Sequence, residues 1–228
     1  MKFNYFFFDL GNTLTISYDL KKSIAETKFK NVEKEKMSIF AELFDSTLKN
    51  EFESNVRSVN HKEIVEKLII KSNIQIHKNE IDEFIDCFLN SYIKKCKIAS
   101  YSKKVLDFLL SKKKTIALVS NVTGPKHIFD NHLRILKIEK YFKAVVWSSV
   151  IGYRKPAKEI FEYAIKLTNA KIIESIFIGD NEKADIIGAN SVGMKTVLLV
   201  NNISEISNSK ADWVIRKKDF ANFITDFV

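Results

Sequence analysis

The chain has 228 residues, 46% of them hydrophobic, which suits one large domain or one domain with an insertion. No run reaches about 18 apolar residues, so we expect no membrane-spanning helix, and the N-terminus lacks a signal-peptide pattern. The two cysteines, Cys87 and Cys96, form no CxxC pair, which favours a reducing compartment and predicts a cytoplasmic protein.

Positive charge is unevenly distributed along the chain. The formal net charge is +9, of which residues 16–98 contribute +1 and the remainder +8. Such an excess can attract small anionic substrates over long range, although a lysine-rich solvated surface gives the same pattern. The triple Lys112-Lys113-Lys114 ends an expected helix, where cations suit the helix dipole. We therefore expect no nucleic-acid partner, and the sequence does not specify an oligomeric state.

The chain begins with an apolar strand and continues into a long helical insert. Residues 3–8 are expected to form the first strand. From Leu20 to Ile98, apolar residues recur at helical spacing and neither Gly nor Pro occurs, which predicts about four helices with breaks near 58–60 and 72–73. The aromatic residues of this insert are expected to form its own core: Phe40, Phe44, Phe84 and Phe88.

After Ser100 the pattern changes to an alternation of strands and helices. We expect helices at 102–113, from Gly124-Pro125, at 156–169, at 182–192 and at the C-terminus, and strands at 115–119, 142–147, 175–178, 196–200 and 213–215. Alternation of this kind is typical of an α/β fold in which helices cover both faces of a doubly wound parallel sheet.

Aspartates follow two of the expected strands. Asp9 comes directly after the first strand, and Asp180 follows the strand 175–178, with Asp185 five residues further on. In open α/β sheets, ligands bind outside the carboxyl ends of the strands. Carboxylate oxygens are the ligands that Mg²⁺ prefers. We therefore expect Asp9 and Asp180 to hold one Mg²⁺, with their oxygens within about 5 Å of each other.

Two further strand-end residues suit the binding of a phosphate. Ser120 closes the strand 115–119, and Lys155 lies in the segment Gly152-Tyr153-Arg154-Lys155-Pro156. A carboxylate nucleophile, a hydroxyl, an ammonium and a metal pair are the groups that phosphoryl transfer to a carboxylate requires, because the cations offset repulsion between the nucleophile and the phosphate.

Together these segments resemble the haloacid dehalogenase superfamily, in particular its phosphatase branch with a helical class 1 cap. The matching segments, in chain order, are Phe8-Asp9-Leu10-Gly11-Asn12-Thr13-Leu14, Ser120, Arg154-Lys155-Pro156, Gly179-Asp180 through Asp185, and the helix around Gly188–Met194. Each motif is weak alone, but four in order at suitable separations are specific. The resemblance implies a catalytic core of residues 1–15 and 99–228 and a cap of residues 16–98 over the carboxyl-end face of the sheet.

The resemblance also implies roles for individual residues. Asp9 is expected to be the nucleophile and a metal ligand, with the backbone carbonyl of Gly11 and the side chain of Asp180 as further ligands. Asp185 is expected to support the metal directly or through water. Ser120 and Lys155 are expected to bind phosphate, and Lys155 also to orient Asp9. The neighbouring Asn121 is expected to contact the substrate or to close the turn. The implied activity is Mg²⁺-dependent hydrolysis of a small phosphorylated metabolite.

Gly11 departs from the family pattern. Phosphatases of this superfamily usually carry a second Asp two residues after the nucleophile, where it serves as general acid and base. A glycine cannot transfer a proton, and general acid–base help is worth ~10²–10⁴-fold. Loss of the acid matters least for acyl phosphates, phosphoanhydrides, sugar 1-phosphates and aryl esters, whose leaving groups depart readily.

Three other functions stay open at this stage. A catalytically impaired binding protein with the same fold is supported by Gly11 alone. A 2-haloacid dehalogenase uses the same Asp nucleophile without a metal, and Asp180 with Asp185 argues against it. A phosphonoacetaldehyde hydrolase needs a Schiff-base lysine from the cap, and the sequence singles none out.

Overall fold

The first apolar run forms β1 (Tyr5–Phe8), the central strand of a six-stranded sheet in the computed structural model, which describes residues 2–54, 56–203 and 208–228. The strand order is β5-β4-β1-β6-β7-β8, and every neighbouring pair is parallel. The other strands are β4 (Thr115–Ser120), β5 (Ala144–Trp147), β6 (Ser175–Gly179), β7 (Lys195–Val200) and β8 (Trp213–Arg216). The predicted doubly wound parallel sheet is confirmed.

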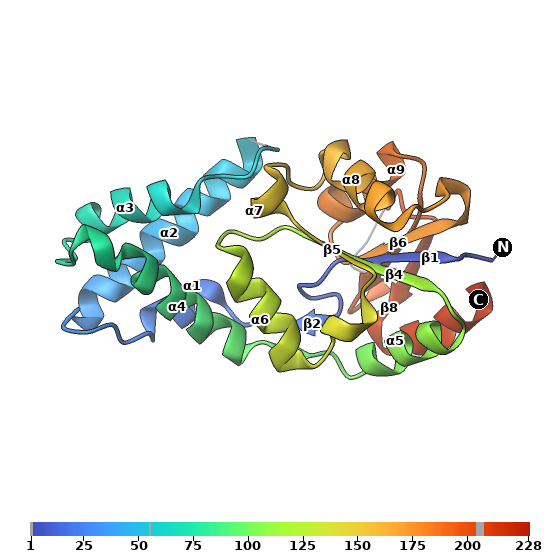
Figure 1. Cartoon of the computed structure of the whole chain (residues 1–228), viewed down its shortest axis with the longest axis horizontal. Helices are drawn as coiled ribbons and strands as arrows, with labels where there is room; N and C mark the ends of the chain where they lie inside the picture. The colour runs from blue at the N-terminus through green and yellow to red at the C-terminus, as the bar shows by residue number, and fades with distance from the viewer. Residues whose placement is uncertain (1, 55, 204–207) are drawn as a thin grey trace.

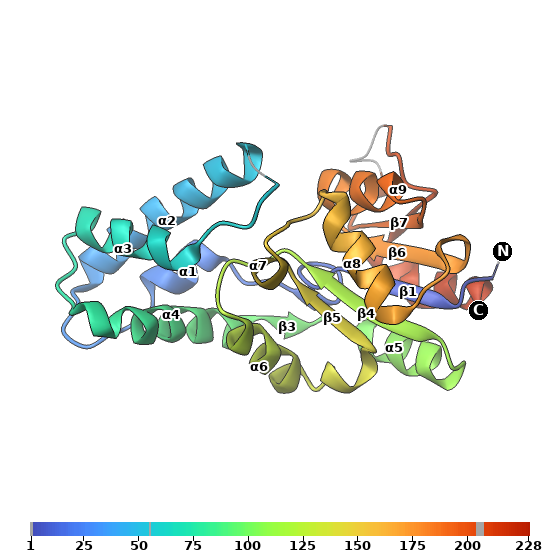
Figure 2. The same cartoon turned by 45° about the horizontal axis from the view of Figure 1, so that its top comes forward.

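Helices cover both faces of this sheet, which is why its strands are almost continuously apolar. Figure 2 shows α8 and α9 on one face and α5 and α6 on the other. Phe6 and Phe8 of β1 pack in the cluster that includes α5 and α6, whereas Phe7 packs with α8 and α9, as the two-residue period of a strand requires. The helices of the core are α5 (Ser102–Ser111), α6 (Lys126–Leu136), α7 (Ser148–Ile151), α8 (Lys158–Thr168), α9 (Gly188–Ser191) and α10 (Phe220–Phe223).

The long insert forms four helices that lie together at the end of the molecule opposite both chain termini (Figure 1). They are α1 (Leu20–Ala25), α2 (Lys34–Ser54), α3 (His61–Lys71) and α4 (Ile81–Lys95). The four predicted core aromatics are fully buried here, and their rings contact one another in edge-to-face, stacked and tilted arrangements: Phe40, Phe44, Phe84 and Phe88. These helices make up most of the cap, residues 16–98.

A short two-stranded ladder joins the cap to the sheet. β2 (Thr15–Ile16) pairs with β3 (Lys97–Ile98) in antiparallel orientation, with Thr15 opposite Ile98. The chain therefore enters and leaves the cap at two adjacent points. This ladder was not predicted, because strands of two residues carry no periodic signal. The proposed domain boundaries at residues 16 and 98 fall within it.

Some local structure differs from the sequence-based expectation. The segment expected as a helix from 182 to 192 begins with a π-helical turn, η4 (Glu182–Ile187), before α9. Short 3-10 turns occur at Lys78–Glu80, Glu139–Tyr141, Ile172–Glu174, Lys217–Asp219 and Ile224–Phe227. Within the described residues, no helix has the length and apolar character needed to cross a membrane.

Candidate active site

The sheet topology brings the strand-end residues to one place. β1 lies between β4 and β6, with Phe8 opposite Leu118 on one side and Ile178 on the other. Ser120 is the last residue of β4, and Asp9 and Asp180 directly follow the carboxyl ends of β1 and β6. The connections leave β1 and β6 toward opposite edges of the sheet, so the site lies at a topological switch point, where open α/β sheets bind ligands.

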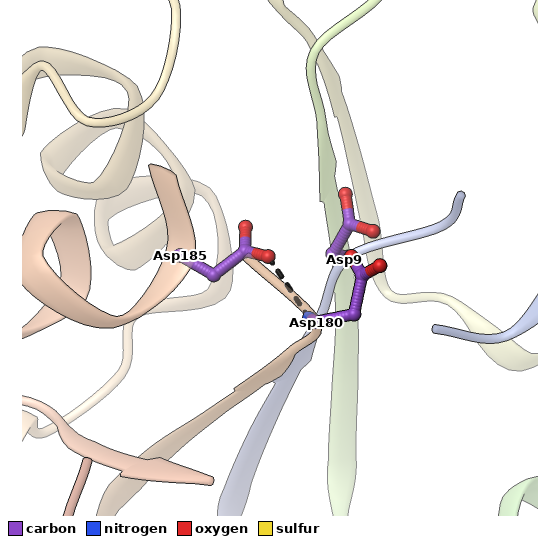
Figure 3. Close-up of side chains that lie close together, drawn as sticks. All are labelled: Asp9, Asp180 and Asp185. Atoms are coloured by element: carbon purple, nitrogen blue, oxygen red, sulfur yellow. Dashed lines mark hydrogen bonds between the residues drawn. The ribbon is translucent and has the colours of Figure 1, made fainter. Parts of the chain in front are cut away.

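The three aspartates form one compact cluster. Each offers a carboxylate oxygen, and these atoms all lie within 4.8 Å of one another. Figure 3 shows the side chains of Asp9 and Asp180 side by side above the strand ends, with Asp185 reaching toward them from the following turn. The separation lies inside the limit of about 5 Å expected for two ligands of one ion.

Asp185 is held in place by the backbone around it. Its Oδ2 atom accepts hydrogen bonds from the backbone N–H groups of Asp180 (3.1 Å) and Asn181 (3.0 Å), and it is carried on the π-helical turn η4. A Cβ at Gly179 would lie 2.3 Å from this oxygen, so the glycine is what allows the carboxylate to approach the strand end. The glycine of the Gly-Asp pair in the fourth motif is therefore required for steric reasons.

Lys155 connects two members of the cluster. Its Nζ atom donates to Oδ1 of Asp9 at 2.7 Å and to Oδ1 of Asp185 at 2.6 Å, and the ammonium is almost completely buried. The side chain of Asn121 holds the backbone of Lys155 at both ends. Its Oδ1 accepts from the Lys155 N–H (2.8 Å) and its Nδ2 donates to the Lys155 carbonyl (3.0 Å). Asn121 thus fixes the position of Lys155.

Burial and mutual repulsion dominate the electrostatics of the cluster. Burial raises the pKa of Asp9 to about 7 against the attraction of Lys155, and repulsion from Asp185 adds to the rise. Burial, with repulsion from Asp185, raises the pKa of Asp180 to about 6. Burial tends to lower the pKa of Lys155, but the carboxylates of Asp185 and Asp9 outweigh it and raise that pKa, so Lys155 is charged at neutral pH.

The residues present suit a divalent cation. Three carboxylates converge, and Lys155 is the one cation in direct contact with them among the described residues. The cluster therefore keeps an excess of negative charge, and burial together with repulsion from Asp185 raises the pKa of both Asp9 and Asp180. A donor set made only of oxygens matches Mg²⁺ rather than a soft metal.

The aspartates and Ser120 line a cavity of about 310 Å³ that the cap closes from the other side. Cap residues that line it are mainly apolar: Leu20, Leu48, Phe52, Leu89 and Tyr92. Burial raises the pKa of the Tyr92 phenol, which keeps it neutral. No lysine of the cap lines this cavity among the described residues. Which cap residues face the site could not be read from sequence, because helical periodicity does not say which parts of two domains meet.

Gly11 also lines the cavity, and the space beside it is partly filled. A Cβ built at Gly11 would lie 3.2 Å from Oγ of Ser17, and the backbone of Gly11 is not in the left-handed region. The conformation thus does not require glycine. Ser17 places its hydroxyl close to the position where family phosphatases carry their second Asp, and sequence reasoning missed it.

Comparison with known proteins decides the family. The sequence profile of haloacid dehalogenase-like hydrolases matches residues 7–199. The chain belongs to this family. The matched range includes the insert that forms the cap and all the strand-end residues described above.

Among characterised relatives of this haloacid dehalogenase-like hydrolase, ribulose-1,5-bisphosphate 5-phosphatase from Halopiger xanaduensis is 28% identical over 127 residues, covering 56% of the chain and 52% of the relative. Glyceraldehyde 3-phosphate phosphatase from Pyrococcus furiosus is 44% identical over 62 residues, covering 27% of the chain and 26% of the relative. The chain thus matches about half or less of the length of these relatives.

Solved structures share the whole fold at low sequence identity. A HAD phosphatase from Thermococcus onnurineus superposes with a TM-score of 0.68 at 20% identity, covering 98% of both chains. A 2-haloacid dehalogenase from Pseudomonas syringae pv. Tomato gives the same TM-score at 17% identity, covering 99% and 100%. A magnesium-bound HAD hydrolase from Bacillus subtilis also gives 0.68, at 18% identity and 99% and 100% coverage. Likeness at this level shows the fold and does not separate the activities.

Proposed function

We propose that this hydrolase cleaves the phosphate ester of a small phosphorylated metabolite in a Mg²⁺-dependent reaction, through an aspartyl-phosphate on Asp9. The observation that carries the proposal is the joint position of Asp9, beside Lys155 and within 4.8 Å of two other carboxylates, at the floor of a cavity. The phosphatase names of the two relatives support the same reaction class.

In the proposed reaction Asp9 is the nucleophile. An oxygen of its carboxylate attacks the phosphorus, the bond between phosphorus and the leaving-group oxygen breaks, and that oxygen then takes a proton from solvent. Water attacks the phosphorus of the aspartyl-phosphate in the second step, which releases inorganic phosphate and restores Asp9. Lys155 fixes the orientation of Asp9 before attack, because its ammonium holds one of the two carboxylate oxygens.

The surrounding groups would bind the charge of the phosphate. Asp9, Asp180 and the carbonyl of Gly11 would hold Mg²⁺, with Asp185 supporting it through its contacts to the backbone of Asp180. When bound, Mg²⁺ would supply positive charge that offsets the repulsion between the carboxylate nucleophile and the phosphate. Lys155 and the hydroxyl of Ser120, which lines the same cavity, would bind the phosphate oxygens.

Gly11 narrows the expected substrates. With no carboxylic acid at this position, departure of the leaving group depends on its own basicity. We therefore propose acyl, anhydride, anomeric or aryl phosphates as better substrates than simple alkyl phosphates.

The rival functions fit the site less well. A phosphonoacetaldehyde hydrolase needs a cap lysine at the substrate, whereas no cap lysine lines the cavity in the described part of the chain. A 2-haloacid dehalogenase has no use for the excess negative charge that Asp180 and Asp185 create beside Asp9. A non-catalytic binding protein is supported by Gly11, but not by the buried Lys155–Asp9 pair.

A substrate screen tests the proposal directly. Sugar phosphates, acyl phosphates, nucleotides and aryl phosphates are incubated with the wild-type protein in Mg²⁺ and in EDTA, and released phosphate is measured. We expect Mg²⁺-dependent release from at least one class. Absence of turnover of every substrate class with Mg²⁺ present would favour the alternative that the protein is a non-catalytic binding protein.

A further inference from the structure

A second cavity of about 300 Å³ adjoins the catalytic one. The two share lining residues from both parts of the molecule, among them Phe52 of the cap and Asn121 and Lys155 of the core. The second cavity differs from the first in being lined by Arg154. A molecule seated on Asp9 and Lys155 could therefore extend into this second space without leaving the protein.

Arg154 is buried and has no partner for its charge among the residues that the structure describes. The residue is 8% exposed, and its Nε atom is buried with no hydrogen bond. No ion pair or guanidinium hydrogen bond joins Arg154 to any other residue in the described ranges. The Arg154 side chain contacts the cap. Its guanidinium carbon lies 3.2 Å from the centre of the Phe52 ring.

An unpaired buried charge is costly and is normally neutralised or paired. Burial lowers the pKa of Arg154 to about 10, which still leaves it charged at neutral pH. Two other charged groups line the cavity beside Lys155: Lys183 and Glu53, both exposed. Lys183 adds positive charge to the lining of this cavity. Among the described residues that line this cavity, Arg154 is therefore a buried cation without an ion pair, and the one carboxylate, Glu53, is exposed.

We propose that Arg154 binds a second anionic group of the substrate, a carboxylate or a second phosphate, while the scissile phosphate lies at Asp9. The guanidinium offers N–H donors in a planar fork that matches such groups, and Phe52 holds the plane in position from above. The substrate class is then a phosphorylated acid or a bisphosphate. This inference rests on the proposed function, because that function places the scissile phosphate.

A purely structural role for Arg154 makes a different prediction. Its backbone N–H donates to the carbonyl of Val56, and its side chain contacts Phe52, so it could serve only to attach the cap. The backbone bond survives any substitution other than proline. Arg154→Met keeps a side chain of similar length and an apolar contact with Phe52, and it removes the guanidinium with its charge and N–H donors. A structural Arg154 would lose thermal stability in this variant, whereas a residue kept for a ligand would leave it unchanged or raise it.

Binding of two matched ligands tests the subsite without turnover. 4-Carboxybenzylphosphonate and 4-carbamoylbenzylphosphonate differ only in the charge of the distal group, and both are measured by calorimetry with Mg²⁺ present. Wild type should bind the carboxylate ~10–100-fold more tightly, as expected for hydrogen bonds to a charged group. Arg154→Met should remove this preference, Arg154→Lys should keep part of it, and Lys183→Met should change it less than about threefold. Equal affinity of wild type for both ligands, or an equal loss for both in Arg154→Met, would overturn the subsite.

Two further measurements distinguish a failure of the Arg154 subsite from a failure of the phosphatase function. Turnover by wild type of 4-carbamoylphenyl phosphate, a substrate without a distal anion, reports the catalytic assignment alone. 4-Methylbenzoate carries only the distal anion. In ligand-observed NMR, wild type should bind it several-fold more tightly than Arg154→Met, whether or not any phosphate is hydrolysed. Failure of this difference together with normal turnover would remove the subsite and leave the phosphatase standing.

Discussion

The cap and the catalytic core are stabilised in different ways. In the cap, the buried interior is a cluster of aromatic and aliphatic side chains, and none of its described residues with a charge is buried. The catalytic core has larger apolar clusters on both faces of its sheet but also buries four formally charged side chains: Asp9, Arg154, Lys155 and Asp185.

This difference shows that the residues that stabilise the cap and the residues that form the candidate active site lie in different parts of the molecule. Burying apolar surface stabilises the cap without directional requirements. The buried charges of the core all lie at or next to the two adjoining cavities, where burial raises the pKa of Asp9 and of Asp180 and lowers that of Arg154. Buried charges destabilise the protein in the absence of ligands. They are concentrated at the site where a metal ion and an anionic substrate would neutralise them.

The strongest test of this contrast is removal of the proposed nucleophile, Asp9. Asp9→Asn should lower turnover of an aryl phosphate by ~10⁴-fold or more, because an amide is a far poorer nucleophile than a carboxylate. Released phosphate is the readout, and circular dichroism checks the fold. Asp226→Asn changes an exposed carboxylate in the last turn of the chain and should keep the wild-type rate. A wild-type rate in Asp9→Asn would exclude the covalent mechanism.

A substitution in the core of the cap should lower stability and leave Mg²⁺ binding unchanged. Phe84 is fully buried and its ring contacts Phe29, Phe40 and Phe88, so Phe84→Ala should lower the free energy of unfolding by about 3–5 kcal/mol. Denaturant titration measures this change. At a temperature where both proteins are folded, Mg²⁺ binding should be unaltered, because the aspartates belong to the core.

Ile70→Ala is the matched control in the same cap. Ile70 is 79% exposed, so its truncation should change the free energy of unfolding by less than about 0.5 kcal/mol. Weakened Mg²⁺ binding in Phe84→Ala but not in Ile70→Ala would mean that cap packing and the metal site are coupled.

A substitution at Gly11 is expected to raise the rate of hydrolysis rather than lower it. Wild-type rates should fall steeply as the pKa of the leaving group rises, and Gly11→Asp should raise alkyl-phosphate turnover by ~10–10³-fold by supplying an acid. A Cβ here would lie 3.2 Å from Ser17 Oγ, so the double variant with Ser17→Ala provides room.

Gly11→Asn has nearly the same shape as Gly11→Asp but cannot donate a proton from a carboxylic acid, so it should give no such gain. A flat leaving-group profile for the wild type would show that another residue already supplies the proton. That result would replace our account of Gly11 and leave the phosphatase assignment intact.

Metal binding should depend on pH through the buried aspartates. The folded-state pKa values of Asp9 (about 7) and Asp180 (about 6) lie above the ordinary value of 3.8. The native state therefore takes up protons on these groups, and the stability of the metal-free protein should decrease as pH rises from about 4 to 7. Protons compete with Mg²⁺ over the same range.

Thermal unfolding with and without Mg²⁺ checks this dependence. At pH 8 saturating Mg²⁺ should stabilise the protein by about 2 kcal/mol, or roughly 4–8 °C for a chain of this size. At pH 5 the gain should be much smaller, and Asp180→Asn should nearly abolish it at both pH values. An equal shift at the two pH values in the wild type would contradict the assignment of Asp9 and Asp180 as ligands.

The sheet, the helical character of the cap and the identity of the strand-end residues could all be predicted from the sequence. These follow from local patterns: Asp9, Ser120 and Asp180 each come directly after an apolar run, and parallel strands bring their carboxyl ends to one edge. The aromatic core of the cap was equally predictable, because residues three or four apart lie on one face of a helix.

Contacts between segments that are far apart in the chain could not be predicted and are seen only in the folded protein. Asn121 holds the backbone of Lys155 across 34 residues, and the ring of Phe52 lies on the guanidinium of Arg154 across the boundary between cap and core. Periodicity describes how an element presents its faces, but not which faces of distant elements meet. The unpaired charge of Arg154 therefore became visible only once the chain was folded around it.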